Sequence, residues 1–303
     1  VTAEVLRDTL RMQSTQALNF YLEELNTLGD ELSMSSIVVG VSDALLEFAQ
    51  KSPDTSPHRA VEPYRRAVSW IYARLAATQA SLNGAAPPRA PVGEAQAYAT
   101  PGEVLADLRI IHESLEANGS QALTRGRLRH LRRAIDCFGF HLARLDMRQN
   151  SDIHEATLAE LFSAVDPECS YAEMDEEARI GLLADELKEL RPLMRRNWTY
   201  SEATEKELAI LKAAKAGHDT YGSQSIAASI VSNTRSASDI LGLAVLLREA
   251  GLISSEGASA IDLVPLFETI ADLRNCVGIM DRLLSIPEYR RLVDSRGGTQ
   301  EIM

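Results

Sequence analysis

Cysteine is scarce in this chain of 303 residues, which contains only Cys137, Cys169 and Cys276. No two of them form a C-x-x-C pair, and an odd number cannot be paired completely within one chain. This argues against a disulfide framework of the kind that holds small secreted domains together. We therefore expect a reduced, cytoplasmic protein whose thiols are small, buried and chemically ordinary.

Long apolar runs are absent as well. No stretch approaches the ~20 consecutive apolar residues that a membrane-spanning helix needs, so we expect no membrane partner. Basic residues are the minority charge, since 31 Lys and Arg stand against 43 Asp and Glu, giving a net charge of −12. Such a surface repels nucleic acid and anionic lipid, so we expect neither to bind.

The common motifs of nucleotide-binding and hydrolytic enzymes are also missing. The sequence has no G-x-G-x-x-G, no P-loop, no H-E-x-x-H and no serine elbow. Its six histidines are scattered, and we interpret His141 and His154 as packing residues rather than catalytic bases. The 45% of apolar residues, by contrast, is ample for a large core in one or two domains.

Three segments have the pattern of a β-strand. Residues 139–150 alternate their side chains with period two and become charged toward their end. Residues 225–232 are small, β-branched and uncharged, which is typical of a strand buried on both faces. Residues 261–267 form the third candidate, and Pro265 indicates that this strand ends or becomes irregular there.

A helix start follows each of these strands. Ser151 can cap the first helix, while Ser236 with Asp239 and Thr269 with Asp272 have capping-box spacing. Successive strand–helix units imply parallel strands with right-handed crossovers. Three such strands cannot close a barrel by themselves. The predicted fold class is therefore predominantly α with a few parallel strands, forming part of a (β/α)8 TIM-type barrel with large helical insertions.

The remaining residues are mostly predicted to be helical. Residues 1–138 are expected to be mainly helical, and 139–303 to hold the three β/α units plus helical insertions. The proline-containing stretch 83–100 is interpreted as a surface loop, so that the whole chain lies within one larger domain. The expected helices cover residues 2–28, 42–49, 63–82, 101–117, 124–137, 153–165, 176–190, 201–218, 236–251 and 269–284.

Two charged residues stand where such a barrel would hold its active site. Arg148 and Glu268 each end a strand and closely precede a helix start, and barrel active sites lie at the carboxyl ends of strands. Arginine offers a planar fork for carboxylate or phosphate. A carboxylate that follows apolar neighbours into a barrel needs a partner, and Mg²⁺ or Mn²⁺ is a natural one. From spacing alone, the alternative that either residue belongs to an ordinary ion pair stays open.

Motifs spread along the whole chain resemble those of one enzyme family. Phe138-Gly139-Phe140 followed by Leu145-Asp146-Met147-Arg148-Gln149-Asn150 is similar to F-G-x-x-L-x-x-L-D-x-R-Q-[NE] of the phosphoenolpyruvate carboxylases. Residues 263–273 resemble the family's P-L-F-E-T-x-x-D-L motif. Further similar segments, in the order of the family, are 1–6 (VTAEVL), 62–65 (EPYR), 225–228 (SIAA) and 234–241 (TRSASDIL).

The resemblance implies a carboxy-lyase that adds bicarbonate to phosphoenolpyruvate and gives oxaloacetate and phosphate, an anaplerotic carbon fixation that feeds the tricarboxylic acid cycle. It implies Mg²⁺ or Mn²⁺ as cofactor and no biotin, with carboxyphosphate and a pyruvate enolate as intermediates. By position, it implies that Arg148 is a catalytic residue binding the substrate's phosphate and that Glu268 is a metal ligand. A cytoplasmic homo-oligomer is also implied.

Other motifs of the family are missing from this sequence, namely T-A-H-P-T-E, G-R-G-G and Y-S-D-S-x-K-D. We therefore expect an internal piece of one larger catalytic domain, inactive by itself. We also expect this piece to hold no metal, because a single carboxylate is a poor Mg²⁺ site. Two alternatives remain: a non-catalytic helical module that binds a partner protein, and another barrel enzyme acting on a phosphorylated metabolite.

Overall fold

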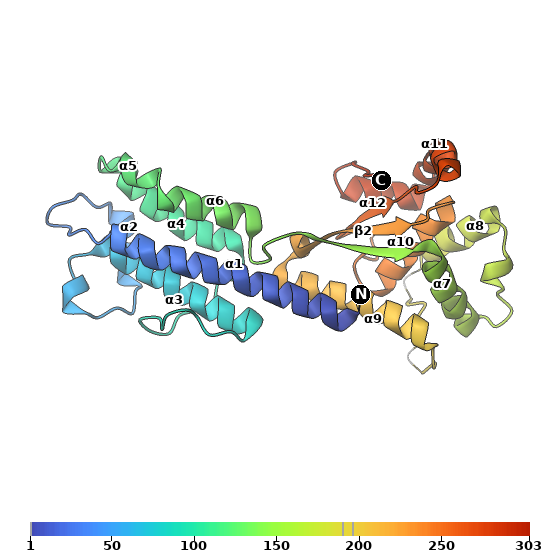
Figure 1. Cartoon of the computed structure of the whole chain (residues 1–303), viewed down its shortest axis with the longest axis horizontal. Coiled ribbons are helices and arrows are strands. Elements are labelled where there is room, and N and C mark those ends of the chain that lie inside the picture. Colours follow the sequence, from blue (N-terminus) through green and yellow to red (C-terminus); the bar gives the residue numbers. More distant parts are fainter. Residues whose placement is uncertain (1, 190, 196) are drawn as a thin grey trace. The chain divides into compact units, whose positions relative to one another are not determined.

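The computed structural model describes residues 2–189, 191–195 and 197–303, which are predominantly helical with one three-stranded parallel sheet (Figure 1). These residues fall into two compact units. We call residues 9–143 the helical unit, and residues 2–8 with 144–303 the sheet unit. None of the described helices is both long enough and apolar enough to cross a membrane.

The helical unit is built on a long first helix, which runs beyond its expected end at Leu28 and passes through Gly29. The chain stays helical past Gly29 because Leu28 and Leu32 keep the buried stripe going, and a side chain at Gly29 would make only ordinary contact with Val68, at 3.5 Å. The other expected helices are confirmed to within a few residues. The elements are α1 (Ala3–Glu31), α2 (Asp43–Gln50), α3 (Pro63–Asn83), α4 (Pro101–Ala117), α5 (Gln121–Thr124) and α6 (Arg127–Phe138), with a 3-10 turn at Pro57–Arg59.

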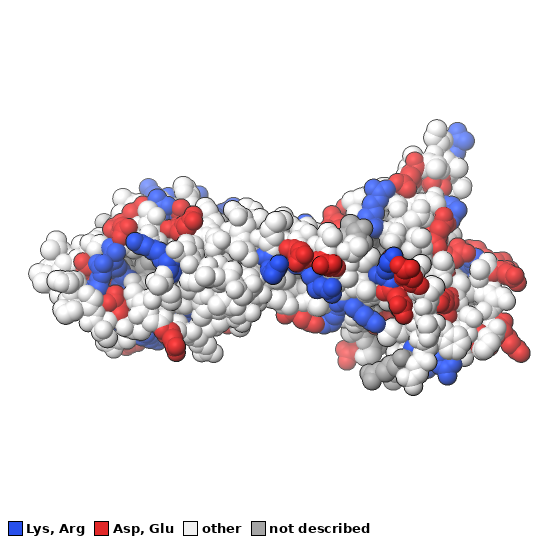
Figure 2. Space-filling view, turned by 60° about the horizontal axis from the view of Figure 1, so that its bottom comes forward, with Lys and Arg blue, Asp and Glu red and all other residues white. Residues whose placement is uncertain are grey.

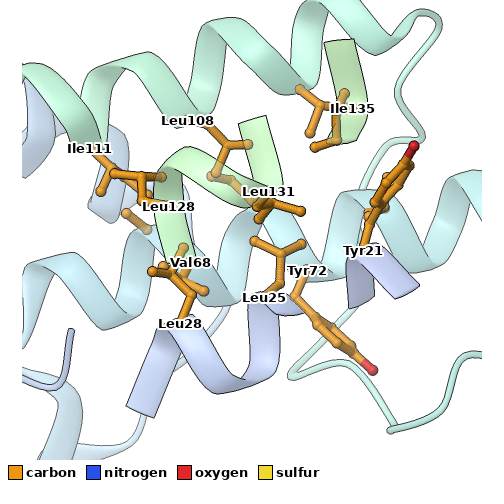
Figure 3. Close-up of a cluster of buried hydrophobic side chains, with 14 of the residues drawn as sticks. Tyr21, Leu25, Leu28, Val68, Tyr72, Leu108, Ile111, Leu128, Leu131 and Ile135 are labelled. Carbon is orange, nitrogen blue, oxygen red and sulfur yellow. The ribbon is translucent and has the colours of Figure 1, made fainter. Parts of the chain in front are cut away.

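Aliphatic side chains of α1, α3, α4 and α6 form the core of the helical unit. Leu25, Val68, Leu108 and Leu131 are buried and point toward one another (Figure 3). Tyr21 lies at the edge of this cluster, and its hydroxyl donates to the carbonyl of Gly139 at 2.9 Å. Burial raises the pKa of Tyr21, so the ring stays a neutral donor.

Helix α2 offers a matched pair of leucines for testing this core. Leu45 is fully buried, whereas the adjacent Leu46 is 39% exposed. We expect Leu45→Ala to lower the free energy of unfolding by about 2–5 kcal/mol, because it leaves a cavity in packed surroundings. Leu46→Ala should cost less than about 1 kcal/mol, since this side chain is partly exposed and leaves no enclosed cavity. Urea unfolding of both variants checks this, and equal losses would contradict the assignment of the core.

The sheet unit carries the strand–helix repeats. Its strands are β1 (Leu145–Asn150), β2 (Ile226–Ser232) and β3 (Asp262–Pro265), paired in parallel in the order β1-β2-β3. The central strand β2 is almost entirely buried, as its composition predicted. The helices are α7 (Ser151–Val165), α8 (Glu176–Glu186), α9 (Glu202–Tyr221), α10 (Ala237–Glu249), α11 (Ile270–Leu284) and α12 (Pro287–Ser295), with 3-10 turns at Tyr171–Glu173 and Ser223–Ser225.

Strand β1 is shorter than expected, and the extension back to residue 139 is wrong. Gly139 and Leu142 have φ values of +50° and +69°, which turn the chain and are incompatible with an extended strand. The alternation holds within β1 itself, where Asp146 and Arg148 are exposed. Strand β3 ends at Pro265, as that residue indicated.

The helix starts after the strands are largely as predicted. Both capping boxes are present, Ser236 with Asp239 before α10 and Thr269 with Asp272 before α11. The cap of α7 is Asn150 rather than Ser151, because the Asn150 side chain accepts from the Asp152 N–H. The end expected at residue 190 for the helix starting at residue 176 lies outside the described residues, and this helix, α8, ends at Glu186.

The thiols are free, but none of them is buried, so the expectation of buried thiols is wrong. Cys137 is exposed, and Cys169 and Cys276 are partly exposed. Burial raises the pKa of Cys169, with the Asp166 carboxylate adding to the shift, so this thiol is less ionised than a free one.

His218 makes the stability of the sheet unit depend on pH. It lies in the last turn of α9, and its Nε2 is 2.8 Å from the carbonyl oxygen of Ile226. Burial lowers the pKa of His218, and the positive charges of Lys215 and Arg296 add to this. The folded state therefore binds the proton less well than the unfolded chain, whose histidine titrates near ~6.5.

The free energy of unfolding should therefore decrease as the pH falls. The stability that neutral His218 contributes is present above the unfolded pKa. It diminishes as the pH falls below that value and is lost as the pH falls through the lower, folded pKa. We expect the midpoint of urea unfolding to decrease between pH 7.5 and 5.5, and to decrease less in His218→Gln. The exposed His58→Gln serves as control and should leave the slope unchanged. A slope unaffected by His218→Gln would count against this origin.

Candidate active site at the carboxyl edge of the sheet

One face of the sheet leads from apolar residues to charged ones. Arg148, Ile230 and Val264 are partners in the strand register and therefore share a face. Ile230 and Val264 pack with Ala228 and Leu266 in a small apolar cluster. Glu268 follows Leu266 by two residues beyond the end of β3. This face thus carries apolar side chains on β2 and β3 and the charged Arg148 and Glu268 toward its carboxyl edge.

The structure brings these two predicted site residues into direct contact. Arg148 Nη2 lies 2.5 Å from Glu268 Oε1, although 120 residues separate them in the sequence. The other carboxylate oxygen, Oε2, accepts from the backbone N–H of Asn233 at 3.0 Å. Their side chains are 55% and 38% exposed, so the pair adds little stability and is open to exchange with a ligand.

Asp272, in the capping box beneath Glu268, stabilises the start of α11. The Thr269 backbone N–H donates to the Asp272 carboxylate at 3.0 Å, and the Asp272 N–H donates to the Thr269 hydroxyl oxygen at 3.1 Å. Hydrogen bonding to Thr269 holds the pKa of Asp272 below its usual range, with the charge of Arg235 acting in the same direction. A carboxylate in the first turn is also favoured by the helix dipole. The residues just after β3 therefore have a fixed backbone.

A second ion pair at this edge was missed by the sequence analysis. Arg235, in the loop after β2, pairs with Asp152 in the first turn of α7. The backbone N–H of Arg235 donates to Asp239 at 2.8 Å, and burial raises the pKa of Asp239 despite this bond. Residues in a loop after a strand carry no periodic signal, so only their charge could have indicated this pair.

On the opposite face of β1, Gln149 contacts the buried carboxylate of Glu207. Gln149 Nε2 donates to Glu207 Oε2 at 2.7 Å, and His154 Nε2 lies 3.5 Å from Glu207 Oε1. Burial acts to raise the pKa of Glu207, but the bonds from His154 and Gln149 outweigh it and leave that pKa lowered. His154 is 2% exposed, which agrees with its interpretation as a packing residue.

Glu268 is the residue that the sequence analysis predicted as a metal ligand. Its carboxylate oxygens are the donor type that Mg²⁺ and Mn²⁺ prefer. However, no group of three His, Cys, Asp or Glu side chains within the described ranges could hold a metal together. The described residues thus supply one suitable ligand, whose oxygens are engaged by Arg148 and Asn233, and not a complete metal site.

Strand β3 is the edge of the three-stranded sheet, but residues at and just beyond its end also bond on the outer side. Its inner neighbour is β2, and on its outer side the N–H of Met303 donates to Pro265 O at 3.0 Å while Phe267 N–H donates to Met303 O at 2.9 Å. This alternation, in which one residue bonds the residues on either side of Leu266, is that of a parallel strand. Met303 therefore occupies the place of a fourth parallel strand next to β3.

Charge is distributed without a large area of one sign on the face that Figure 2 displays, where basic and acidic side chains are interspersed. Many of the arginines are paired with carboxylates, for example Arg127 with Glu24 and Glu31. The net charge of −12 is therefore spread out, and the pair Arg148–Glu268 is locally neutral.

Comparison with known proteins gives one consistent result. A family model described as phosphoenolpyruvate carboxylase matches residues 1–303. Relatives named phosphoenolpyruvate carboxylase are 58% identical in Rhodopseudomonas palustris (strain ATCC BAA-98 / CGA009), 54% in Azoarcus sp. (strain BH72) and 52% in Bradyrhizobium diazoefficiens. Each match covers 100% of this chain and 32%, 33% and 32% of the relative, respectively. The chain thus spans about a third of the length of the relatives that it matches.

Proposed function

Because the chain belongs to the phosphoenolpyruvate carboxylase family, we propose that it forms part of an enzyme that adds bicarbonate to phosphoenolpyruvate, giving oxaloacetate and phosphate. The match over all 303 residues favours this function over an unrelated barrel enzyme or a non-catalytic helical module. The observation that carries the proposal for this chain's own residues is the contact between Arg148 and Glu268 at the carboxyl edge of a parallel sheet.

Arg148 is proposed as the residue that binds the phosphate of the substrate. Its guanidinium is 55% exposed at the edge of the sheet, and its backbone is fixed within β1. A phosphate that approaches this edge can take the place of the Glu268 carboxylate on the guanidinium, because both are anions that accept from the planar fork. The arginine then orients the phosphoryl group and stabilises negative charge on it.

Glu268 is proposed as one ligand of a Mg²⁺ or Mn²⁺ ion. Such an ion would supply positive charge where negative charge develops on the substrate. Glu268 is released for this role when Arg148 turns to the phosphate, and its second oxygen stays bonded to the backbone of residue 233. Biotin has no place in this proposal.

We also propose that the three strands belong to a (β/α)8 barrel and that both units are parts of one larger catalytic domain. Support comes from the parallel order β1-β2-β3, from the strand-like bonds of Met303 beside β3, and from the length of the relatives. We further propose that the complete enzyme is anaplerotic, cytoplasmic and homo-oligomeric, as the resemblance to the family implies.

Formation of oxaloacetate from phosphoenolpyruvate and bicarbonate with Mg²⁺ tests the proposed function. The longer enzyme that carries this chain should form oxaloacetate, measured by coupling to malate dehydrogenase and NADH oxidation. The chain of 303 residues should give no rate above background, because it contributes a single metal ligand and lacks the family's T-A-H-P-T-E histidine. No turnover by the longer enzyme would refute the proposed function, whereas turnover by this chain alone would refute only its expected inactivity.

A further inference from the structure

Asn233 has an unusual backbone beside the candidate site. It directly follows β2, and its φ of +59° places it in the left-handed region, which few residues other than glycine and asparagine adopt readily. Its N–H donates to Glu268 Oε2 at 3.0 Å. Its carbonyl oxygen accepts from the hydroxyl of Ser151 at 2.9 Å. One peptide segment therefore connects the residues that follow β1 and β3.

The neighbours of Asn233 fix this segment firmly. Thr234 is fully buried, its N–H donates to Leu266 O at 3.1 Å, and its hydroxyl donates to Val231 O at 2.8 Å. On the other side, Ser232 Oγ donates to the carbonyl of Gln149 at 3.1 Å. The N–H of Asn233 therefore has a defined direction, which depends on the left-handed turn at this residue.

We propose that Asn233 is a positioning residue whose left-handed backbone holds the Glu268 carboxylate at the place where it faces Arg148. The hydrogen bond from Asn233 to Glu268 does not depend on what the protein does. Its effect on metal binding and catalysis rests on the function proposed above. Asn233 acts through its peptide N–H, which the fold keeps in place, and not through contact with substrate.

The two donors to Glu268 differ in how readily they move. Arg148 reaches the carboxylate with a long side chain that is 55% exposed, so it can leave Glu268 for another anion. The N–H of Asn233 belongs to a backbone held by Ser151 and by the bonds of Thr234. When Arg148 leaves, the peptide bond to Oε2 is what keeps the carboxylate from rotating freely.

Amide hydrogen exchange tests the contact in this chain itself. We expect the Asn233 amide to be protected in the wild type and to exchange about tenfold or more faster in Glu268→Ala, where its acceptor is gone. Glu268→Gln retains an oxygen acceptor and serves as the matched control, with exchange near that of the wild type. Equal exchange in the wild type and Glu268→Ala would overturn the proposal.

A graded series at position 233 tests the consequence in the longer enzyme. Asn233→Gly keeps the N–H and the left-handed backbone, so Mn²⁺ binding by paramagnetic resonance and kcat/KM should stay within about twofold. Asn233→Ala should be intermediate, and Asn233→Val should bind Mn²⁺ about tenfold more weakly and lose kcat/KM similarly, because a β-branched residue resists positive φ. A loss in Asn233→Gly as large as in Asn233→Val would overturn the proposal, since the side chain would then carry the effect.

If the melting temperature shows that Asn233→Val does not fold, a second variant tests the same proposal. Ser151→Ala removes the bond to the Asn233 carbonyl from a site that is 1% exposed. It should weaken Mn²⁺ binding in the same direction as Asn233→Ala, and wild-type binding in both variants would contradict the inference. If the wild-type longer enzyme forms no oxaloacetate, the proposed function fails, while hydrogen exchange still decides the role of Asn233.

Discussion

Replacing Arg148 with alanine in the longer enzyme should lower kcat/KM for phosphoenolpyruvate by about 10²–10³-fold or more, because a charge-assisted fork to the substrate's phosphate is lost. Arg148→Lys should recover only part of this loss, since an ammonium group keeps the charge but not the two parallel donors. The effect should appear in kcat as well as in KM, because phosphoryl charge must be stabilised during the reaction. Steady-state kinetics with phosphoenolpyruvate as the varied substrate measure it.

The control for this variant is another exposed arginine in the same unit. Arg290 pairs with Asp294 on α12 at 3.2 Å and is similarly exposed, so Arg290→Ala should leave kcat/KM within about twofold. The melting temperature of Arg148→Ala should also stay close to that of the wild type, because the pair with Glu268 is largely exposed. A folded Arg148→Ala enzyme with wild-type kcat/KM would remove Arg148 from the site.

Strands and caps could be predicted because their signals are local. The uncharged stretch of β2, the proline that ends β3 and the capping boxes at Ser236 and Thr269 each indicate one conformation of a few residues. The beginning of β1 could not be predicted in this way. Leu142 adopts φ of +69° because its surroundings impose it, and no propensity of leucine indicates a left-handed residue.

Helix ends show the same limit. Glycine commonly stops a helix, so an end at Gly29 was a reasonable prediction, yet α1 continues to Glu31. What decides this is burial, because Leu28 and Leu32 on either side of Gly29 are each 1% exposed and the apolar face of the helix continues past the glycine. Tertiary packing of this kind overrides the local preference of glycine and cannot be predicted from the residues next to the helix end.

The positions of Arg148 and Glu268 followed from the order of strands and helices, whereas their contact did not. Parallel strands place all carboxyl ends on one side, so the two residues had to lie near one another. The register that makes Arg148 a neighbour of Ile230, and the left-handed turn at Asn233 that directs an N–H to Glu268, depend on three-dimensional packing. Burial of Glu207 could have been predicted only weakly, from its place next to the buried Leu208 on α9.

Glu268→Gln in the longer enzyme should raise the concentration of Mg²⁺ or Mn²⁺ needed for half-maximal activity by about 10²-fold. Replacing a residue that only supports a ligand costs ~10–100-fold in metal affinity, so loss of a ligand's charge should reach at least the upper end of that range. The amide keeps the size of the side chain and an oxygen that can accept from Asn233, so the fold should remain intact. Titration of activity with each metal, and of Mn²⁺ binding without substrate, measures the change.

The expected pattern separates a metal ligand from a partner of Arg148. If Glu268 binds the metal, saturating Mn²⁺ restores part of the activity of Glu268→Gln, and Arg148→Ala is not restored because its defect lies in phosphate binding. If Glu268 serves only to neutralise Arg148, the Glu268→Gln enzyme should bind phosphoenolpyruvate as well as the wild type or better, with an unchanged metal requirement. That second outcome would leave Glu268 as half of the ion pair observed at 2.5 Å and would exclude it as a metal ligand.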